Sequence, residues 1–243
     1  MLSNSLDLMI FFPIAVLGHF IIPKKIRYIW LLIASYYFYM CWNAEYALLI
    51  GASTLITYLS GLFLDKAQKT GIKKLIVALS FVSNIGILVF YKYFDFILEN
   101  INVLLTKFDV ELLNNPFDII LPVGISFYTF QALSYTMDVY RGEIKAEKNP
   151  LRYALFVSFF PQLVAGPIER SKNLLNQMKE MEHIKLWNYD RVANGLMQMV
   201  WGLFQKMVIA DRVSVFVDFV YANLHAAGSF ETILAALGFS VQI

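Results

Sequence analysis

Apolar runs separated by short polar turns divide the first half of the sequence into predicted helices. An α-helix needs about 20 mostly apolar residues to cross a bilayer. Runs near that length are Leu6 to Ile22, Ile26 to Trp42, Tyr46 to Leu64, Leu75 to Phe90 or on to Leu98, and Ile119 to Val139. The pattern therefore predicts successive membrane-crossing helices joined by short turns.

The stretch from Leu121 to Met181 is less regular, because prolines and glycines interrupt it. Such residues break backbone hydrogen bonding, which lipid tolerates only where protein or a water-filled cavity covers the break. The interrupting residues are Pro122, Pro161, Gly166 and Pro167. We therefore expect a functional site near this stretch.

A short helix in this stretch is predicted to enter the membrane and return. Asn149 and Pro150 are typical of a helix start, as a capping side chain followed by proline in the first turn. The run from Leu151 to Phe160 is about 15 Å long at about 1.5 Å per residue, roughly half of a hydrocarbon core. Pro161 and the turn at Gly166–Pro167 then break it. A crossing would leave the next basic residues outside, against the positive-inside rule, so we expect a re-entrant, half-membrane element.

An amphipathic helix is predicted from Ser171 onward. One side carries the apolar residues Leu174, Leu175, Met178 and Met181, and the other side is polar. This pattern is typical of a helix that lies in the membrane interface.

The last apolar runs are Arg191 to Arg212 and Glu231 to Ile243. The first has small and polar residues on one face, which favour close contact between helices: Gly195, Gln198, Gly202, Gln205 and Lys206. Val213 to Tyr221 either extends this helix or forms a short partner. The final run is too short to span a bilayer, so we expect the chain to end within an element.

Composition agrees with a polytopic helical membrane protein. Hydrophobic residues make up 58% of the sequence, and the mean hydropathy is +0.58. Charged residues make up 16%, against about 25% in soluble domains. The net charge of +2 is too small to suggest a nucleic-acid partner. The single cysteine, Cys41, cannot form a disulfide within the chain.

The lysines and arginines between the runs predict the orientation in the membrane. Basic residues follow the first, third and fifth runs, whereas the second and fourth turns carry almost none. Because cytoplasmic loops carry the excess of Lys and Arg, we expect an outward N-terminus and a cytoplasmic turn at Arg141 to Arg152. The expected location is the inner or plasma membrane, crossed several times.

The fifth run has a polar face. At about 100° per residue, one sector of the helix holds Gly124, Tyr128, Gln131, Ser134, Tyr135 and Asp138. Two interpretations remain open. The face either makes polar contacts between helices or lines a wet tunnel.

Motifs of soluble enzymes are absent from the sequence: there is no phosphate-binding glycine loop, no H-E-x-x-H and no G-x-S-x-G. No His and Cys residues have metal-ligand spacing, so we expect no metal site. Three blocks nevertheless resemble the bacterial membrane-bound O-acyltransferase family, in particular its alginate O-acetylation branch. They are LPVGISFYTFQALSYTMDVYRGEI, SFFPQLVAGPIERSKNLLNQ and WGLFQKMVIADR.

This resemblance implies an O-acyltransferase, of which residues 1–243 would be the N-terminal part of one membrane-embedded domain. It implies transfer of an acyl group, usually acetyl, from a cytoplasmic donor to a hydroxyl acceptor through a buried tunnel. The donor, such as acetyl-CoA or an acyl carrier, would be a co-substrate, and no bound cofactor is expected. Expected partners are membrane lipid, a polysaccharide acceptor and an extracytoplasmic partner acetyltransferase.

The resemblance also bears on the catalytic residues. The essential histidine of the family lies in a later helix, after a block that begins Q-I-Y-x-D-F-S-G-Y-S, and this sequence ends on the first two letters of that block. None of His19, His183 and His225 has the matching context, so no catalytic residue is assigned and the chain alone is expected to be inactive. The candidate tunnel and substrate residues are Gln131, Tyr135, Gln162, Gly166, Pro167 and Arg170.

Arg170 has two interpretations. Its guanidinium suits a phosphate or carboxylate of the donor, and it equally suits anionic lipid beside the amphipathic helix.

Other functions fit the same pattern. A carrier or flippase also uses broken helices at mid-membrane, although the sequence shows no internal repeat. A membrane scaffold that only docks a partner is a third alternative.

Overall fold

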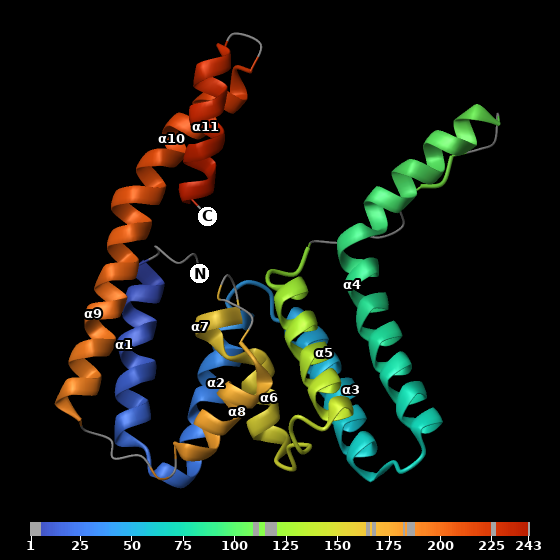
Figure 1. Ribbon diagram of the computed structural model, residues 1–243, viewed down its shortest axis with the longest axis vertical. Helices are drawn as coiled ribbons and strands as arrows, with labels where there is room; N and C mark the ends of the chain where they lie inside the picture. The colour runs from blue at the N-terminus through green and yellow to red at the C-terminus, as the bar shows by residue number, and fades with distance from the viewer. Residues whose placement is uncertain are drawn as a thin grey trace. The chain divides into compact units, whose positions relative to one another are not determined.

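The computed structural model describes residues 6–108, 112–114, 121–163, 166, 169–181, 183, 188–224 and 227–242. Within those residues all regular secondary structure is helical (Figure 1), which confirms the predicted all-α class. The chain divides into two compact units, residues 1–184 and residues 185–243. Each unit is described by itself.

The first unit begins with helices at the predicted runs. They are α1 (Leu6–Ile21), α2 (Arg27–Met40) after a 3₁₀ turn (Lys24–Ile26), α3 (Tyr46–Lys66) and α4 (Thr70–Lys107). Helix α4 has 38 residues and extends beyond both predicted ends, since no proline interrupts its sequence. Within the described chain, α3 and α4 are the helices long and apolar enough to cross a membrane.

Helix α5 (Ile125–Arg141) starts later than the predicted Ile119. Residues 119 and 120 lie outside the described part of the chain, whereas residues 121–124 are described and precede the helix. Gly124 stands at the boundary with φ 74, a left-handed conformation that only glycine adopts readily. The carbonyl oxygen of Leu163 also lies where a Cβ of residue 124 would be. The sequence therefore needs glycine here for two independent reasons.

Helix α6 (Pro150–Ser158) starts as predicted and ends earlier than predicted. The Asn149 side chain accepts hydrogen bonds from the amides of Leu151 and Arg152, at 3.0 and 3.2 Å. The break falls at Phe159, which has an extended ψ of 111, and not at Pro161 as expected. Pro161 is instead the second residue of α7 (Phe160–Leu163), because the first turn of a helix does not use the N–H that proline lacks.

Helix α8 (Ser171–Glu180) has the predicted amphipathic pattern, but protein covers its apolar side. Leu174, Leu175 and Met178 are buried in the core beside α5 and α6. The helix therefore belongs to the packed bundle, and only its polar side is open.

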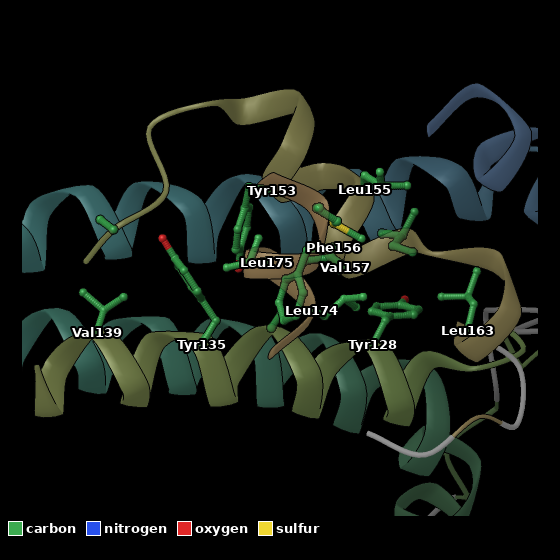
Figure 2. Close-up of a cluster of buried hydrophobic side chains, with 14 of the residues drawn as sticks. Tyr128, Tyr135, Val139, Tyr153, Leu155, Phe156, Val157, Leu163, Leu174 and Leu175 are labelled. Carbon is green, nitrogen blue, oxygen red and sulfur yellow. The ribbon is translucent and has the colours of Figure 1, made fainter. Parts of the chain in front are cut away.

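The core of the first unit lies between α2, α3, α5, α6 and α8. Figure 2 shows aromatic rings of α5 and α6 meeting in it, and the ring centroids of Tyr135 and Tyr153 are 4.5 Å apart. The Tyr135 ring also lies so close to Gly61 of α3 that a Cβ there would be 2.7 Å from its hydroxyl oxygen. The glycine thus lets α3 and α5 approach each other.

Hydroxyl and amide side chains connect four helices of this unit. Ser53 Oγ on α3 donates to Asn84 Oδ1 on α4 at 2.5 Å, and Tyr153 Oη on α6 donates to Thr57 Oγ1 on α3 at 2.8 Å. Ser80 on α4 and Thr136 on α5 have their hydroxyl oxygens 3.4 Å apart. Such contacts hold helices together where apolar surroundings offer no driving force of their own.

The second unit is a long helix followed by a hairpin. Its elements are α9 (Tyr189–Phe204), a π-helical segment (Gln205–Ala210), α10 (Asp211–Ala222) and α11 (Ser229–Gln242). Residues 213–221 therefore extend the preceding helix. Helices α10 and α11 approach each other closely at Gly238, where a Cβ would lie 3.1 Å from side-chain atoms of Val213 and Val217.

The π-helical segment of this unit carries an ion pair. Lys206 Nζ is 2.5 Å from Asp211 Oδ1. In an α-helix, residues three or four apart face each other, whereas a π-helix bonds residues five apart. The spacing of this pair therefore matches the local π conformation.

Candidate functional site

The chain from Pro150 to Ser171 leaves and rejoins the same end of α5. The segment before α6 contacts the C-terminal half of α5, since the amide of Glu147 donates to Tyr135 Oη at 2.9 Å. At the far end of α5, Leu163 of α7 lies against Gly124. The chain then comes back, because Ser171 Oγ donates to Asp138 Oδ2. This course has the geometry expected of a re-entrant element; its direction in a membrane stays a prediction.

We call residues 150–171 the return segment. The polar face predicted for α5 packs against it. Tyr128, Gln131 and Tyr135 are buried. Gly124 contacts α7, and Gln131 contacts α6. Tyr135 contacts the loop before α6, and Asp138 contacts α8. The interpretation as polar contact between helices accounts for these residues.

The break at Phe159 is stabilised by side chains from two other helices. In a continuous α-helix the amide of residue 160 would donate to the carbonyl of residue 156. Instead, Gln131 Nε2 of α5 donates to the Phe156 carbonyl at 2.6 Å, and Ser35 Oγ of α2 accepts from the Phe160 amide at 3.2 Å. These two backbone groups therefore have side-chain partners, although they lie in the core.

Gln162 and Gly166 meet at the turn after α7. The amide of Gly166 donates to the Gln162 carbonyl at 3.1 Å, and a Cβ on Gly166 would be 2.6 Å from Cβ of Gln162. The Gln162 Nε2 atom is buried and has no hydrogen-bond partner in the described structure. Pro167 lies outside the described residues. Glycine is thus required at the turn by the close approach of α7.

Arg170 lines a pocket of about 280 Å³ at the C-terminal end of α5. The other lining residues are Ser134, Asp138, Arg141, Glu143 and Glu169. Each carboxylate has a contact: Asp138 with Ser171, Glu143 with Arg141 at 3.9 Å, and Glu169 with Asn173 at 3.0 Å. Arg170 makes no ion pair with any described residue and is exposed. Its guanidinium is therefore available to an anionic ligand.

The six candidate residues fall into three places. Gln131 and Tyr135 are buried on α5, Gln162 and Gly166 form the turn after α7, and Arg170 lines the pocket. The return segment connects these places, but the pocket is lined by Arg170 and not by the other described candidates.

A buried ion cluster was missed by the sequence analysis. The side chain of Glu147 is 4% exposed, and its carboxylate lies 3.6 Å from Arg152 Nη1 and 3.0 Å from Lys179 Nζ. In the sequence KAEKNP, Glu147 stands between two lysines, which is typical of a solvated loop. The Asn149 cap marked the start of α6, but no local signal indicated that Glu147, two residues before the cap, is buried.

Comparisons with known proteins cover the whole chain. It is 34% identical to a peptidoglycan O-acetyltransferase of Helicobacter pylori and 33% identical to a protein of Pseudomonas aeruginosa named probable alginate O-acetylase AlgI. Each match covers 99% of this chain, and 50% and 45% of the respective relative, so the chain spans about half their length. A teichoic acid D-alanyltransferase of Bacillus subtilis is 25% identical over 42% of the chain.

No protein-family model and no solved structure matches this chain. The relatives named for alginate and peptidoglycan O-acetylation are members of one family, and the similarity to them extends over nearly every residue here. The chain, about half as long as these relatives, is similar over 99% of its residues to members of the membrane-bound O-acyltransferase family.

Proposed function

We propose that this chain is the N-terminal half of a membrane O-acyltransferase that modifies a polysaccharide of the cell envelope, with acetyl as the group transferred. The observation that carries the proposal is the similarity over 99% of the chain to proteins named as O-acetyltransferases of two different polymers. Relatives with different acceptors point to shared acyl-transfer chemistry, so the proposal names no particular polymer. The protein would reside in the plasma membrane and cross it several times.

The pocket at Arg170 is the proposed entrance for the acyl donor. Donors such as acetyl-CoA or an acyl carrier bear phosphate groups, and an arginine guanidinium binds phosphate through paired hydrogen bonds. Arg170 is exposed, and Arg141 is in the same wall. The orientation expected from the basic loops would put this end of α5 in the cytoplasm, where the donor is made.

The chemistry proposed for the complete enzyme is acyl transfer to a hydroxyl group. A base must take the hydroxyl proton as a carbon–oxygen bond replaces the acyl carbon–sulfur bond of a thioester, and it then returns the proton to the departing thiolate, which leaves as a thiol; histidine suits this near neutral pH. We assign this role to no histidine of residues 1–243. Residues 1–243 would contribute the donor entrance and part of the tunnel wall. The acyl group would pass along this wall to an extracytoplasmic partner.

The test uses the full-length protein in membrane vesicles with an isotopically labelled acetyl donor. We expect label to reach a polymer or partner protein, and Arg170→Gln to raise the KM for the donor by about tenfold, equivalent to losing one charge-assisted contact. Lys172→Gln is the control, because it removes a positive charge from an exposed position on the same helix that does not line the pocket.

Two results would contradict the proposal. Movement of a substrate across the vesicle without any acetyl transfer would favour a carrier. Equal KM values for Arg170→Gln and Lys172→Gln would remove Arg170 from the donor entrance.

A further inference from the structure

We propose that Glu147 is a positioning residue that fixes α8, and through it Arg170, at the wall of the pocket. This inference rests on the proposed function only for its effect on donor binding. The placement of α8 by Glu147 stands on the geometry of the described residues alone.

Glu147 is itself held firmly. Its amide donates to Tyr135 Oη at 2.9 Å, and its Oε1 accepts from the Asn149 amide at 3.0 Å. Tyr135 is fully buried, with its ring against Gly61 of α3. The position of the carboxylate is therefore set by α5, by α3 and by the cap of α6.

The carboxylate of Glu147 contacts cations on two helices, one at the start of the return segment and one after it. Arg152 belongs to α6, which leads into the return segment, and Lys179 belongs to α8, which follows it. Arg152 is also placed from α2, since its guanidinium carbon is 5.4 Å from the centroid of the Tyr28 ring. A buried charge is tolerated when it is paired and hydrogen-bonded, and removal of one partner leaves the others uncompensated. The Lys179 side chain is 47% exposed and that of Glu147 is 4% exposed, so their contact links α8 to the loop before α6 through a carboxylate that is itself removed from water.

Helix α8 is held by carboxylates at both of its ends. Ser171 at its first turn bonds to Asp138 of α5, and Lys179 at its last turn pairs with Glu147. Between them, Leu174, Leu175 and Met178 are in the core. Arg170 directly precedes this helix, and its carbonyl accepts from the amides of Asn173 and Leu174 at 3.0 and 3.2 Å. The backbone of Arg170 is therefore joined to α8, and we expect a change in the seating of this helix to displace it.

The first readout reports the seating of α8 without reference to activity. In a full-length protein freed of its native cysteines, including the exposed Cys41, Met178→Cys places a probe at a position that is 3% exposed. We expect Glu147→Gln or Lys179→Met to raise the maleimide labelling rate of this probe at least about tenfold, since opening of a buried site controls such reactions. Lys179→Met leaves the Glu147–Arg152 contact in place and so serves if Glu147→Gln does not fold.

Two controls separate a change of charge from loss of the link. Glu180→Gln neutralises an exposed acid of the same helix, and Lys179→Arg retains the cation beside Glu147. Neither should change the labelling rate at residue 178 by more than about twofold, as expected for surface substitutions.

The second readout is the KM for the acyl donor. We expect Lys179→Met to raise KM with little change in kcat, and Lys179→Arg to restore it. Unchanged labelling at residue 178 in both Glu147→Gln and Lys179→Met would overturn the placement of α8, whatever the activity. Faster labelling with an unchanged KM would overturn the action on Arg170, and Glu147 would then only stabilise the fold. The proposed acyl transfer is tested separately, since it would fail only if no acetyl transfer occurs in the unaltered protein.

Discussion

Helices α5 and α9 have similar sequence patterns and different environments. Both are apolar helices with a face of small and polar residues. On α5 that face is buried, and Gln131 bonds to a carbonyl of the return segment. On α9 no described side chain is buried, and Gln198 is exposed, as is Gln205 at the start of the π-helical segment. A polar face on an apolar helix therefore predicts a contact surface, but the pattern alone does not say what the surface contacts.

The largest expected difference between the two helices concerns their glycines. Gly124→Ala should lower the free energy of unfolding by about 3 kcal/mol, because a left-handed residue with a Cβ costs ~1–2 kcal/mol and the new Cβ would meet the Leu163 carbonyl. Gly195→Ala on α9 should instead be neutral or stabilising by up to about 1 kcal/mol, since a Cβ at this position would have no neighbour within 4 Å among the described residues. Equilibrium unfolding of the full-length protein in mixed micelles measures both. Equal effects would contradict the close approach of α7 to α5.

The glutamines give the next largest contrast. Gln131→Leu removes the partner of the buried Phe156 carbonyl and should cost about 2 kcal/mol, within the range for an unsatisfied buried group. Gln198→Leu makes the same chemical change at an exposed position of α9 and should change stability by less than about 0.5 kcal/mol. The same unfolding assay applies. A tolerated Gln131→Leu would mean that the break at Phe159 does not need its side-chain partner.

Tyrosine hydroxyls should show a smaller difference. Tyr153→Phe deletes the donor to Thr57 Oγ1 and should cost about 1 kcal/mol, the net value of a typical hydrogen bond. Tyr189→Phe, at a position that is 74% exposed, is the control and should leave the midpoint of unfolding unchanged. A stabilising Tyr153→Phe would argue against the polar connection between α3 and α6.

The smallest effect is expected in the π-helical segment. Lys206→Met removes the ion pair with Asp211, but both side chains are substantially exposed, and such pairs contribute only about 0–1 kcal/mol. Unfolding should therefore change by less than about 0.5 kcal/mol. A large loss of stability would show that the ion pair, and not the surrounding helix, maintains the π conformation.

The sequence predicted the helices better than their interruptions. Length and hydropathy located α1 to α3, and local capping chemistry located the start of α6 at Asn149. The break was predicted at Pro161 but occurs at Phe159, because the partners that stabilise it, Ser35 and Gln131, are remote in sequence. Local signals cannot reveal which backbone groups distant side chains will satisfy.

The candidate site was predicted only in part, because some of its contacts join residues that are distant in sequence. Irregularity in the stretch from Leu121 to Met181 predicted a functional site, and the structure shows short helices α6, α7 and α8 in this stretch; the site itself stays a prediction. Glu147 was missed because its neighbours in sequence are lysines, whereas its neighbours in space are Tyr135, Arg152 and Lys179. The roles of Gln131, Gln162 and Arg170 in acyl transfer stay predictions.

We expect the return segment to begin and end at one membrane face. Labelling of single cysteines at positions 145 and 172, in a full-length protein freed of its native cysteines including Cys41, tests this course of the chain, because these exposed positions lie on either side of α6 and α7. An impermeant maleimide applied to intact cells and to inside-out vesicles distinguishes the faces. We predict that both cysteines react only in inside-out vesicles; labelling of 145 from one face and of 172 from the other would contradict the account.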